Sequence, residues 1–219
     1  MIYLDFVPRS QPASEPAAAI TLVEEPGPDR RSRRRAEGRQ RVFRAAVDLF
    51  IERGFDATTM DDIAERADVA RATVFNYFQR KTAFLDEWSA GRRQYALAAV
   101  RAEHLDDHPL PEVLDRYMIE LARLSTRTRA ETVALMGAAV HSTNVLGNPP
   151  LALELATFIT RARDSGQVRA DVDPDLAGLL VATGYFAILT EWIAAEPAPF
   201  DLESRLLHMV AILCQGLSS

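Results

Sequence analysis

The sequence predicts an all-α protein of about nine helices, with a small three-helix domain followed by a larger helical domain. Two observations lead to this prediction. Apolar residues recur along most of the chain at the three- and four-residue spacing of amphipathic helices. Clusters of glycine, proline and aspartate interrupt that spacing at the places where the chain must turn. A hydrophobic fraction of 48% is sufficient for a buried core.

Composition narrows the class of protein. Cys214 is the single cysteine, which excludes a disulfide framework and favours the reducing cytoplasm. We find no apolar run of the roughly 20 residues that a membrane span needs. The N-terminal stretch contains an acid and a proline, unlike a signal peptide. We therefore expect a cytoplasmic protein without membrane association.

Charge is distributed unevenly along the chain. Residues 1–29 carry a net charge of −4, residues 30–81 carry +5 and residues 82–219 carry −7. Such a split favours a module for a polyanion joined to an acidic body. A solvated basic helix face would give the same charge pattern, so this observation leaves both interpretations open.

The chain divides into three segments. Residues 1–29 contain five prolines and no helical period, and we predict a disordered extension there. Residues 30–81 are predicted to form a basic arm and a compact helical domain, and residues 82–219 a larger helical domain. The arm, residues 30–35, reads RRSRRR; beside a DNA-reading motif such an arm can reach phosphates or the minor groove.

The first predicted helix runs from Arg39 to a stop at Gly54. Its apolar positions fall on one face of a 3.6-residue helix. They are Val42, Phe43, Ala46, Leu49 and Phe50. A short second helix follows, for which Thr59 is a suitable N-cap and Asp62 completes a capping box. Asp68 falls at the next turn, where aspartate tolerates left-handed backbone better than most residues do.

A third helix, again short, is predicted to start near residue 70 or 71. Val74, Phe75 and Phe78 are predicted to form its inner face. The outward or lateral positions are Arg71, Ala72, Thr73, Asn76 and Tyr77. Two short helices joined by a tight turn and supported by a preceding helix make a helix-turn-helix.

This helix-turn-helix would present Asn76 and Arg71 to a DNA groove, where asparagine pairs with adenine and arginine with guanine. The hydroxyl groups of Thr73 and Tyr77 can donate to phosphate oxygens. Lys81 begins the next helix, where a phosphate is also favoured. The predicted DNA-contacting residues are Arg33, Arg34, Thr59, Arg71, Ala72, Thr73, Phe75, Asn76, Tyr77 and Lys81.

Residues 41–87 resemble the tetracycline-repressor (TetR) family of one-component transcriptional regulators. The resemblance rests on AAVDLFIERGFDATTMDDIAERADVARATVFNYFQRKTAFL, in which helix face, turn and aromatic positions agree in order and spacing. Two positions depart from the family pattern. Asp68 stands where glycine is usual, and Phe75 stands where tyrosine is common and so lacks a hydroxyl for phosphate.

The resemblance implies a DNA-binding transcriptional regulator, a repressor that binds a palindromic operator as a homodimer. It also implies that residues 82–219 bind a small-molecule effector, dimerise and release the DNA when the effector binds. Few charges fall on the apolar faces of this segment, so we expect a largely apolar effector. No cofactor, metal or enzymatic activity is expected.

Effector-contacting residues are sought on the apolar faces between Trp88 and Leu189. The candidates are Tyr95, Tyr117, Met118, Met136, His141, Asn144 and Phe158. Each of them also fits simple core packing. His141 and Asn144 are the more informative pair, because a polar group on an apolar face needs a partner.

The body is predicted to contain helices at 82–104, 112–127, 131–144, 151–164, 175–195 and 200–217. The last two are the best candidates for a dimer interface built as a four-helix bundle. The predicted interface residues are Leu180, Tyr185, Leu206, Val210 and Leu213. Four small residues would allow close helix approach: Ala177, Gly178, Ala182 and Gly184. The alternative is that both helices belong to the core of one chain.

Other function classes have weaker support. His104 and His108 would share a helix face and could bind a metal, but Pro109 and the acids between them favour the end of a loop. No nucleophile–base pair, phosphate-binding glycine loop or dinucleotide fingerprint is present. A transcriptional activator of the same fold, or an architectural DNA-binding protein without an effector, remains an alternative.

Overall fold

The computed structural model describes residues 30–105, 108–142 and 149–217, excluding the side chains of His141 and Ser142. The elements of secondary structure within those residues are helices, as predicted. The helices are α1 (Arg30–Arg53), α2 (Met60–Arg66), α3 (Arg71–Tyr77), α4 (Thr82–Ala102), α5 (Leu110–Arg127), α6 (Arg129–Ser142), α7 (Pro150–Asp164), α8 (Pro174–Ile193) and α9 (Leu202–Leu217). The predicted disordered extension, residues 1–29, lies outside the described residues.

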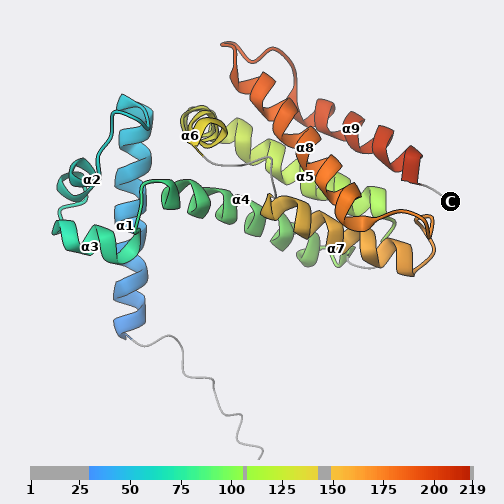
Figure 1. The fold of residues 1–219 in the computed structure, drawn as a ribbon, viewed down its shortest axis with the longest axis horizontal. Coiled ribbons are helices and arrows are strands. Elements are labelled where there is room, and N and C mark those ends of the chain that lie inside the picture. The colour runs from blue at the N-terminus through green and yellow to red at the C-terminus, as the bar shows by residue number, and fades with distance from the viewer. Residues whose placement is uncertain (1–29, 106–107, 143–148, 218–219) are drawn as a thin grey trace, which may run out of the picture.

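The helices form a head and a body (Figure 1). The head consists of α1, α2 and α3, and the body contains α5 to α9. Helix α4 starts against the head and runs into the body, so that it belongs to both parts. Helix α6 lies between α1 and the rest of the body and makes a second contact between the two parts.

Helix α1 begins at Arg30, earlier than the start at Arg39 that the apolar pattern predicts. The run at residues 30–35 is therefore the exposed beginning of a helix rather than a separate arm. Arginine is a good helix former but gives no apolar period when all its neighbours are also exposed. For this reason periodicity locates the buried part of α1, from Val42 onward, and misses its beginning.

The turns of the helix-turn-helix have the local chemistry that the sequence predicts. The Oγ1 of Thr59 accepts a hydrogen bond from the amide of Asp62 at 3.1 Å, and the carboxylate of Asp62 accepts from the amide of Thr59 at 2.8 Å. This capping box starts α2. Asp68 has a φ of 52°, the left-handed conformation expected at the turn before α3. The two helices are therefore held in place by their own termini.

Four phenylalanine rings form the core between the head and α4. Phe84 of α4 stacks on Phe78 with ring centroids 4.0 Å apart, and Phe43 and Phe50 of α1 pack around the same ring. Phe84 is fully buried. The head therefore needs the first turn of α4 to complete its core.

Close helix packing in the body depends on two glycines. At Gly178 of α8, an added Cβ would lie 2.5 Å from the carbonyl oxygen of Ala152 and 2.8 Å from the amide nitrogen of Ala156, both on α7. At Gly184, it would lie 2.5 Å from the Sδ of Met209 on α9. Both glycines thus mediate contacts within one chain. The sequence-based expectation that they serve the dimer interface is corrected at these positions.

Helix α8 is long and apolar enough to cross a membrane by length and composition, contrary to the sequence-based statement that no run reaches that length. In the structure, 39% of its most apolar window is buried against other helices. A core helix of a globular protein passes the same test. Leu176 and Leu180 of α8 are large apolar residues that remain exposed.

Replacing Gly178 by alanine is expected to lower the free energy of unfolding by about 1–3 kcal/mol, because the new methyl group meets backbone atoms of α7 that cannot rotate away. Gly91 of α4 is the matched control, since nothing lies within 4 Å of a Cβ added there. The Gly91→Ala change should raise the free energy of unfolding by about 0.5–1 kcal/mol. Urea unfolding of both variants measures these changes, and equal effects would contradict the close approach at Gly178.

Candidate functional site

Helix α3 presents a polar surface to solvent. Arg71, Ala72 and Asn76 are exposed, and Thr73 is half-buried beside them. Val74 and Phe78, on the opposite side, are almost completely buried. The α3 side chains predicted to face DNA therefore lie on the side of the helix that is free of the head's own core.

Phe75 does not belong to the inner face to which the periodicity assigned it. Its side chain is exposed, and the guanidinium of Arg71 lies 5.4 Å from the centre of its ring. Arg71 also pairs with Asp61 of α2, with Nε and Oδ1 3.1 Å apart. Within α3 the buried side chain is Val74, and Phe78 is buried at the C-cap that follows the helix, so Phe75 has no place on the inner face.

Tyr77 and the end of α3 are fixed by α1. A Cβ added at Gly38 would lie 2.7 Å from the hydroxyl oxygen of Tyr77, so the tyrosine side chain crosses α1 at its glycine. Arg39 donates from Nη1 to the carbonyl of Tyr77 at 2.6 Å and pairs with Glu87 of α4 through Nε and Nη2. The same guanidinium lies over the ring of Phe78. Arg39 thus joins α1, α3 and α4, a role that no sequence pattern indicated.

Lys81 has a structural role instead of the predicted phosphate contact. Its Nζ donates to the carbonyl oxygens of Phe55 at 2.6 Å, Thr58 at 3.0 Å and Asp56 at 3.3 Å. An ammonium group has three N–H donors, so all of them are engaged. The side chain also lies over the ring of Phe55. Lys81 therefore fastens the turn between α1 and α2 to the start of α4.

The remaining predicted DNA contacts are accessible to different degrees. Arg33 and Arg34 are exposed on the first turns of α1. Thr59 is exposed too, but its hydroxyl donates to the carboxylate of Asp62 at 2.7 Å within the capping box. That bond lowers the pKa of Asp62 and holds the hydroxyl in its capping role.

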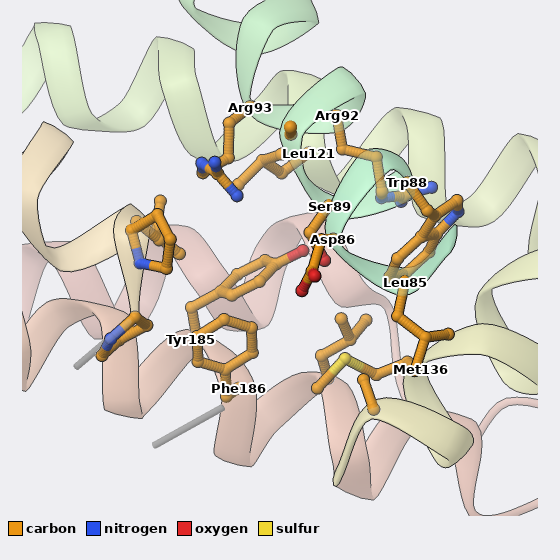
Figure 2. A pocket seen from close by; sticks show the side chains of 16 residues that line it. Leu85, Asp86, Trp88, Ser89, Arg92, Arg93, Leu121, Met136, Tyr185 and Phe186 are labelled. Atoms are coloured by element: carbon orange, nitrogen blue, oxygen red, sulfur yellow. The ribbon is translucent and has the colours of Figure 1, made fainter. Parts of the chain in front are cut away.

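A cavity of about 410 Å³ lies in the body between α4, α5, α6, α8 and the start of α7. Leu85, Trp88, Leu121, Met136 and Leu189 contribute apolar surface to it. Figure 2 shows the side chains of Trp88, Arg92 and Arg93 along α4, with Tyr185 extending from α8 toward that helix. A volume of this size suits a small-molecule ligand.

Arg92 is the unusual residue of this cavity, because it is 5% exposed and charged. Nη2 donates to the Oγ of Ser125 at 2.5 Å, Nη1 donates to the Oγ1 of Thr128 at 3.2 Å, and the guanidinium lies 4.6 Å from the ring of Trp88. Burial lowers the pKa of Arg92 and raises that of Tyr185. The sequence prediction did not include Arg92, because an arginine beside polar neighbours gives no periodic signal.

Known proteins match this chain at the head, and some of them over most of its length. A family model described as "Bacterial regulatory proteins, tetR family" matches residues 42–88. That segment contains the capping box, the turn at Asp68 and the reading face of α3 described above. The head is therefore the helix-turn-helix domain of the TetR family. The chain is a transcriptional regulator with an N-terminal helix-turn-helix domain, and it resembles bacterial regulatory proteins.

Three relatives illustrate the range of this TetR-family match. An uncharacterized regulator, YdeS of Bacillus subtilis (strain 168), is 46% identical over 26% of this chain and 29% of its own length. The repressor KstR of Rhodococcus jostii (strain RHA1) is 27% identical over 93% of this chain and 94% of its own. The crystal structure of Thermus thermophilus FadR, a TetR-family repressor in complex with lauroyl-CoA, is 29% identical, with a TM-score of 0.64 over 83% of this chain and 95% of that one.

The residues predicted to contact an effector lie in different parts of the structure. Of these residues, Met136 lines the 410 Å³ cavity. Tyr117 and Met118 are fully buried in the core. Phe158 lines a different cavity of about 270 Å³, and Tyr95 is exposed on the surface. Asn144 and the side chain of His141 lie outside the described residues.

Tyr117 has a polar partner deep in the body. Its hydroxyl donates to Oε2 of Glu154 at 2.6 Å, and Oε1 of Glu154 accepts from Arg93 at 3.0 Å. Burial, reinforced by this bond to Glu154, raises the pKa of Tyr117. The tyrosine therefore links α5 to α7 and is satisfied without a ligand.

The residues predicted to form the dimer interface differ in their burial. Leu206 and Val210 of α9 are almost completely buried within the single chain, and Tyr185 lines the cavity. These three positions are corrected, because a side chain buried in its own core has no surface for a partner. Leu213 is half-buried, and Leu180 is 54% exposed. The spacing of apolar residues shows which face of a helix is buried. It does not show whether that face packs against a partner subunit or against the chain's own core.

Replacing Lys81 by methionine is expected to lower the free energy of unfolding by about 1–3 kcal/mol, because three carbonyl oxygens lose a charged donor. Arg80→Met is the control, since Arg80 makes an exposed ion pair with Asp86 that contributes under about 1 kcal/mol. Chemical denaturation compares the two variants. If Lys81→Met kept full stability but reduced the salt slope of DNA binding by about one unit, the phosphate role would be restored.

Proposed function

We propose that the protein is a cytoplasmic repressor that binds a two-fold symmetric operator as a homodimer and releases it when a small effector occupies the 410 Å³ cavity. Residues 30–81 would form the DNA-binding domain and residues 82–219 the effector-binding and dimerisation domain. Relatives named as repressors support the direction of regulation. The observation on which the proposal rests is the exposed polar face of α3, held rigidly over a buried aromatic core.

DNA reading is assigned to α3 because its exposed side chains have the chemistry for it. Asn76 can bind an adenine edge and Arg71 a guanine edge, while the hydroxyl groups of Thr73 and Tyr77 would donate to phosphate oxygens. Phe75 adds apolar surface beside Arg71 for contact with a thymine methyl group. Arg33 and Arg34 extend the basic surface along α1.

Dimerisation is assigned to the outer surface of α8 and α9. Leu176 and Leu180 of α8 and Ile212 of α9 are each more than half exposed, although they are large apolar residues on packed helices. Exposed apolar side chains on two helices that pack against each other are candidates for an interaction surface. A two-fold dimer would place two copies of α3 in major grooves about 34–36 Å apart.

Effector control is assigned to α4 and α6, which line the cavity and also contact the head. Phe84 of α4 is buried in the head's core, and Trp88, four residues later, lines the cavity. Met136 of α6 lines the cavity as well, and α6 packs against α1. A ligand that fits better when these helices are displaced would change the spacing of the two heads.

The lauroyl-CoA complex of Thermus thermophilus FadR supports an effector with an apolar tail, because that repressor resembles this chain over most of both lengths. The apolar lining of the cavity supports the same class. The cavity also favours a ligand-responsive regulator over an architectural DNA-binding protein. An activator of the same fold would differ in where its operator lies relative to the promoter.

Selection of bound sequences from a random duplex library is expected to yield a two-fold symmetric motif. Asn76→Ala should weaken discrimination at one base pair in each half-site by about 1–3 kcal/mol, because the amide that reads a base edge is lost. Binding to random DNA, which depends on phosphate contacts, should change little.

The matched control for this experiment is Gln94→Ala, which removes an exposed amide from α4 outside the reading face. It should leave the selected motif unchanged. Recovery of no motif by the wild-type protein, with binding lost steeply as salt increases, would overturn the specific-regulator proposal. Equal losses on specific and random DNA would overturn only the role of Asn76.

Leu180→Glu is expected to convert the dimer to a folded monomer. Each dimer would lose two buried leucines, each worth about 1.5–3 kcal/mol, so the dissociation constant should rise by about 100-fold or more. Sedimentation or light scattering measures the change. Ile51→Glu in the head is the control, because Ile51 is an exposed apolar residue of α1 and not of α8 or α9. A Leu180→Glu protein that remained dimeric would place the interface on another surface.

A further inference from the structure

The charged side chains that line the cavity differ in how they are paired. Asp86 is exposed and pairs with Arg80, with Oδ2 and Nη2 3.2 Å apart. Arg93 pairs with Glu154, with Nε and Oε1 3.0 Å apart. Arg92 makes no ion pair with any of the described residues. Its positive charge is therefore the unpaired one among the described residues that line the cavity.

The guanidinium of Arg92 is nevertheless held in a fixed position. Ser125 donates its own hydroxyl proton to the carbonyl of Leu121 at 2.6 Å, and Thr128 donates to the carbonyl of Leu124 at 2.8 Å. Both hydroxyl oxygens are thereby oriented as acceptors for Nη2 and Nη1 of Arg92. These neutral contacts orient the guanidinium but supply no negative charge.

The Nε of Arg92 has no hydrogen-bond partner among the described residues, and it is the buried side-chain polar atom that this part of the chain leaves unsatisfied. Burial lowers the pKa of Arg92, and Tyr185 and then the carboxylate of Glu131 act against that shift. The Oε1 of Glu131 accepts the indole N–H of Trp88 at 2.6 Å. An unsatisfied buried donor on an unpaired buried cation is costly unless something else compensates it.

We propose that the effector is an apolar-tailed carboxylic acid, and that its carboxylate binds the Nε edge of Arg92 while its tail fills the apolar part of the cavity. This inference rests on the proposed function of the cavity as the effector site. A carboxylate supplies both an acceptor for Nε and a countercharge for the guanidinium. Leu85, Met136 and Leu189 provide the apolar wall for the tail.

Charge distinguishes a free acid from other ligands with the same tail. An alcohol or a thioester oxygen can accept one hydrogen bond from Nε but cannot neutralise a buried guanidinium. Free carboxylates are therefore favoured over acyl thioesters at this site. That preference differs from the lauroyl-CoA found in the Thermus thermophilus structure, and it can be tested directly.

Titration calorimetry on the full chain would compare dodecanoate, dodecan-1-ol and lauroyl-CoA, each below its micelle concentration. Dodecanoate is expected to bind at least about tenfold more tightly than dodecan-1-ol, because a charge-assisted bond replaces a neutral one. Arg92→Gln should reduce dodecanoate affinity about 10–100-fold and leave dodecan-1-ol affinity nearly unchanged. The matched control is Arg93→Gln, which alters an adjacent arginine on the same cavity wall and should keep the preference for the acid.

Each outcome decides the inference separately from the cavity's function. If the acid and the alcohol bind equally and both release the selected operator, the proposal of a carboxylate ligand is wrong. The proposal that the cavity is the effector site is then supported. The proposal of a carboxylate ligand is also wrong if lauroyl-CoA binds most tightly and Arg92→Gln does not change its affinity. If none of the three ligands binds, the proposals of a carboxylate ligand and of an apolar effector are both wrong. The proposal of sequence-specific DNA binding is not affected. If Arg92→Gln does not fold, the wild-type ranking of acid and alcohol still decides.

Discussion

The arrangement of the whole molecule depends on one helix that is packed into two cores. Phe84 stacks on Phe78 in the head, and Trp88, one helical turn later, donates its indole N–H to Glu131 in the body. An α-helix is stiff over so short a distance, and interiors are close-packed. Helix α4 therefore cannot tilt without disturbing a core at one end or the other. A ligand in the cavity beside Trp88 would lie one helical turn from Phe84, the residue that completes the head.

The positive charge that gathers at residues 30–81 has two different uses. Arg39 and Lys81 are directed inward, where they bind backbone carbonyls and hold α1, α3 and α4 together. Arg33 and Arg71 are exposed to solvent, although Arg71 pairs with Asp61 on the surface. Net charge alone does not separate these uses, because a cation that caps carbonyls and one that meets phosphate contribute equally to the sum. Basic residues thus both stabilise the head and make it attractive to DNA.

The body combines dense packing at some helix contacts with a cavity at others. Gly178 lets α8 approach the backbone of α7, whereas the space bounded by α4, α6 and α8 stays open at about 410 Å³. Small residues are thus used where the helices must be fixed to one another. Large side chains line the space where a ligand would have to be accommodated. The exposed Leu176 and Leu180 leave α8 incompletely buried in one chain, which its apolar composition does not predict.

The sequence by itself determined the helical class, the capping box at Thr59, the left-handed turn at Asp68 and the buried stripe of α1, because each depends on residues close together in the chain. Tertiary structure decided the rest. Periodicity placed Phe75 inside and named Leu206 for a partner, but burial depends on which distant helix covers a residue. Arg92 gave no signal at all, since its meaning comes from α5, α6 and α8 closing around it. Local patterns fix helices and their caps, while long-range contacts decide what each face meets.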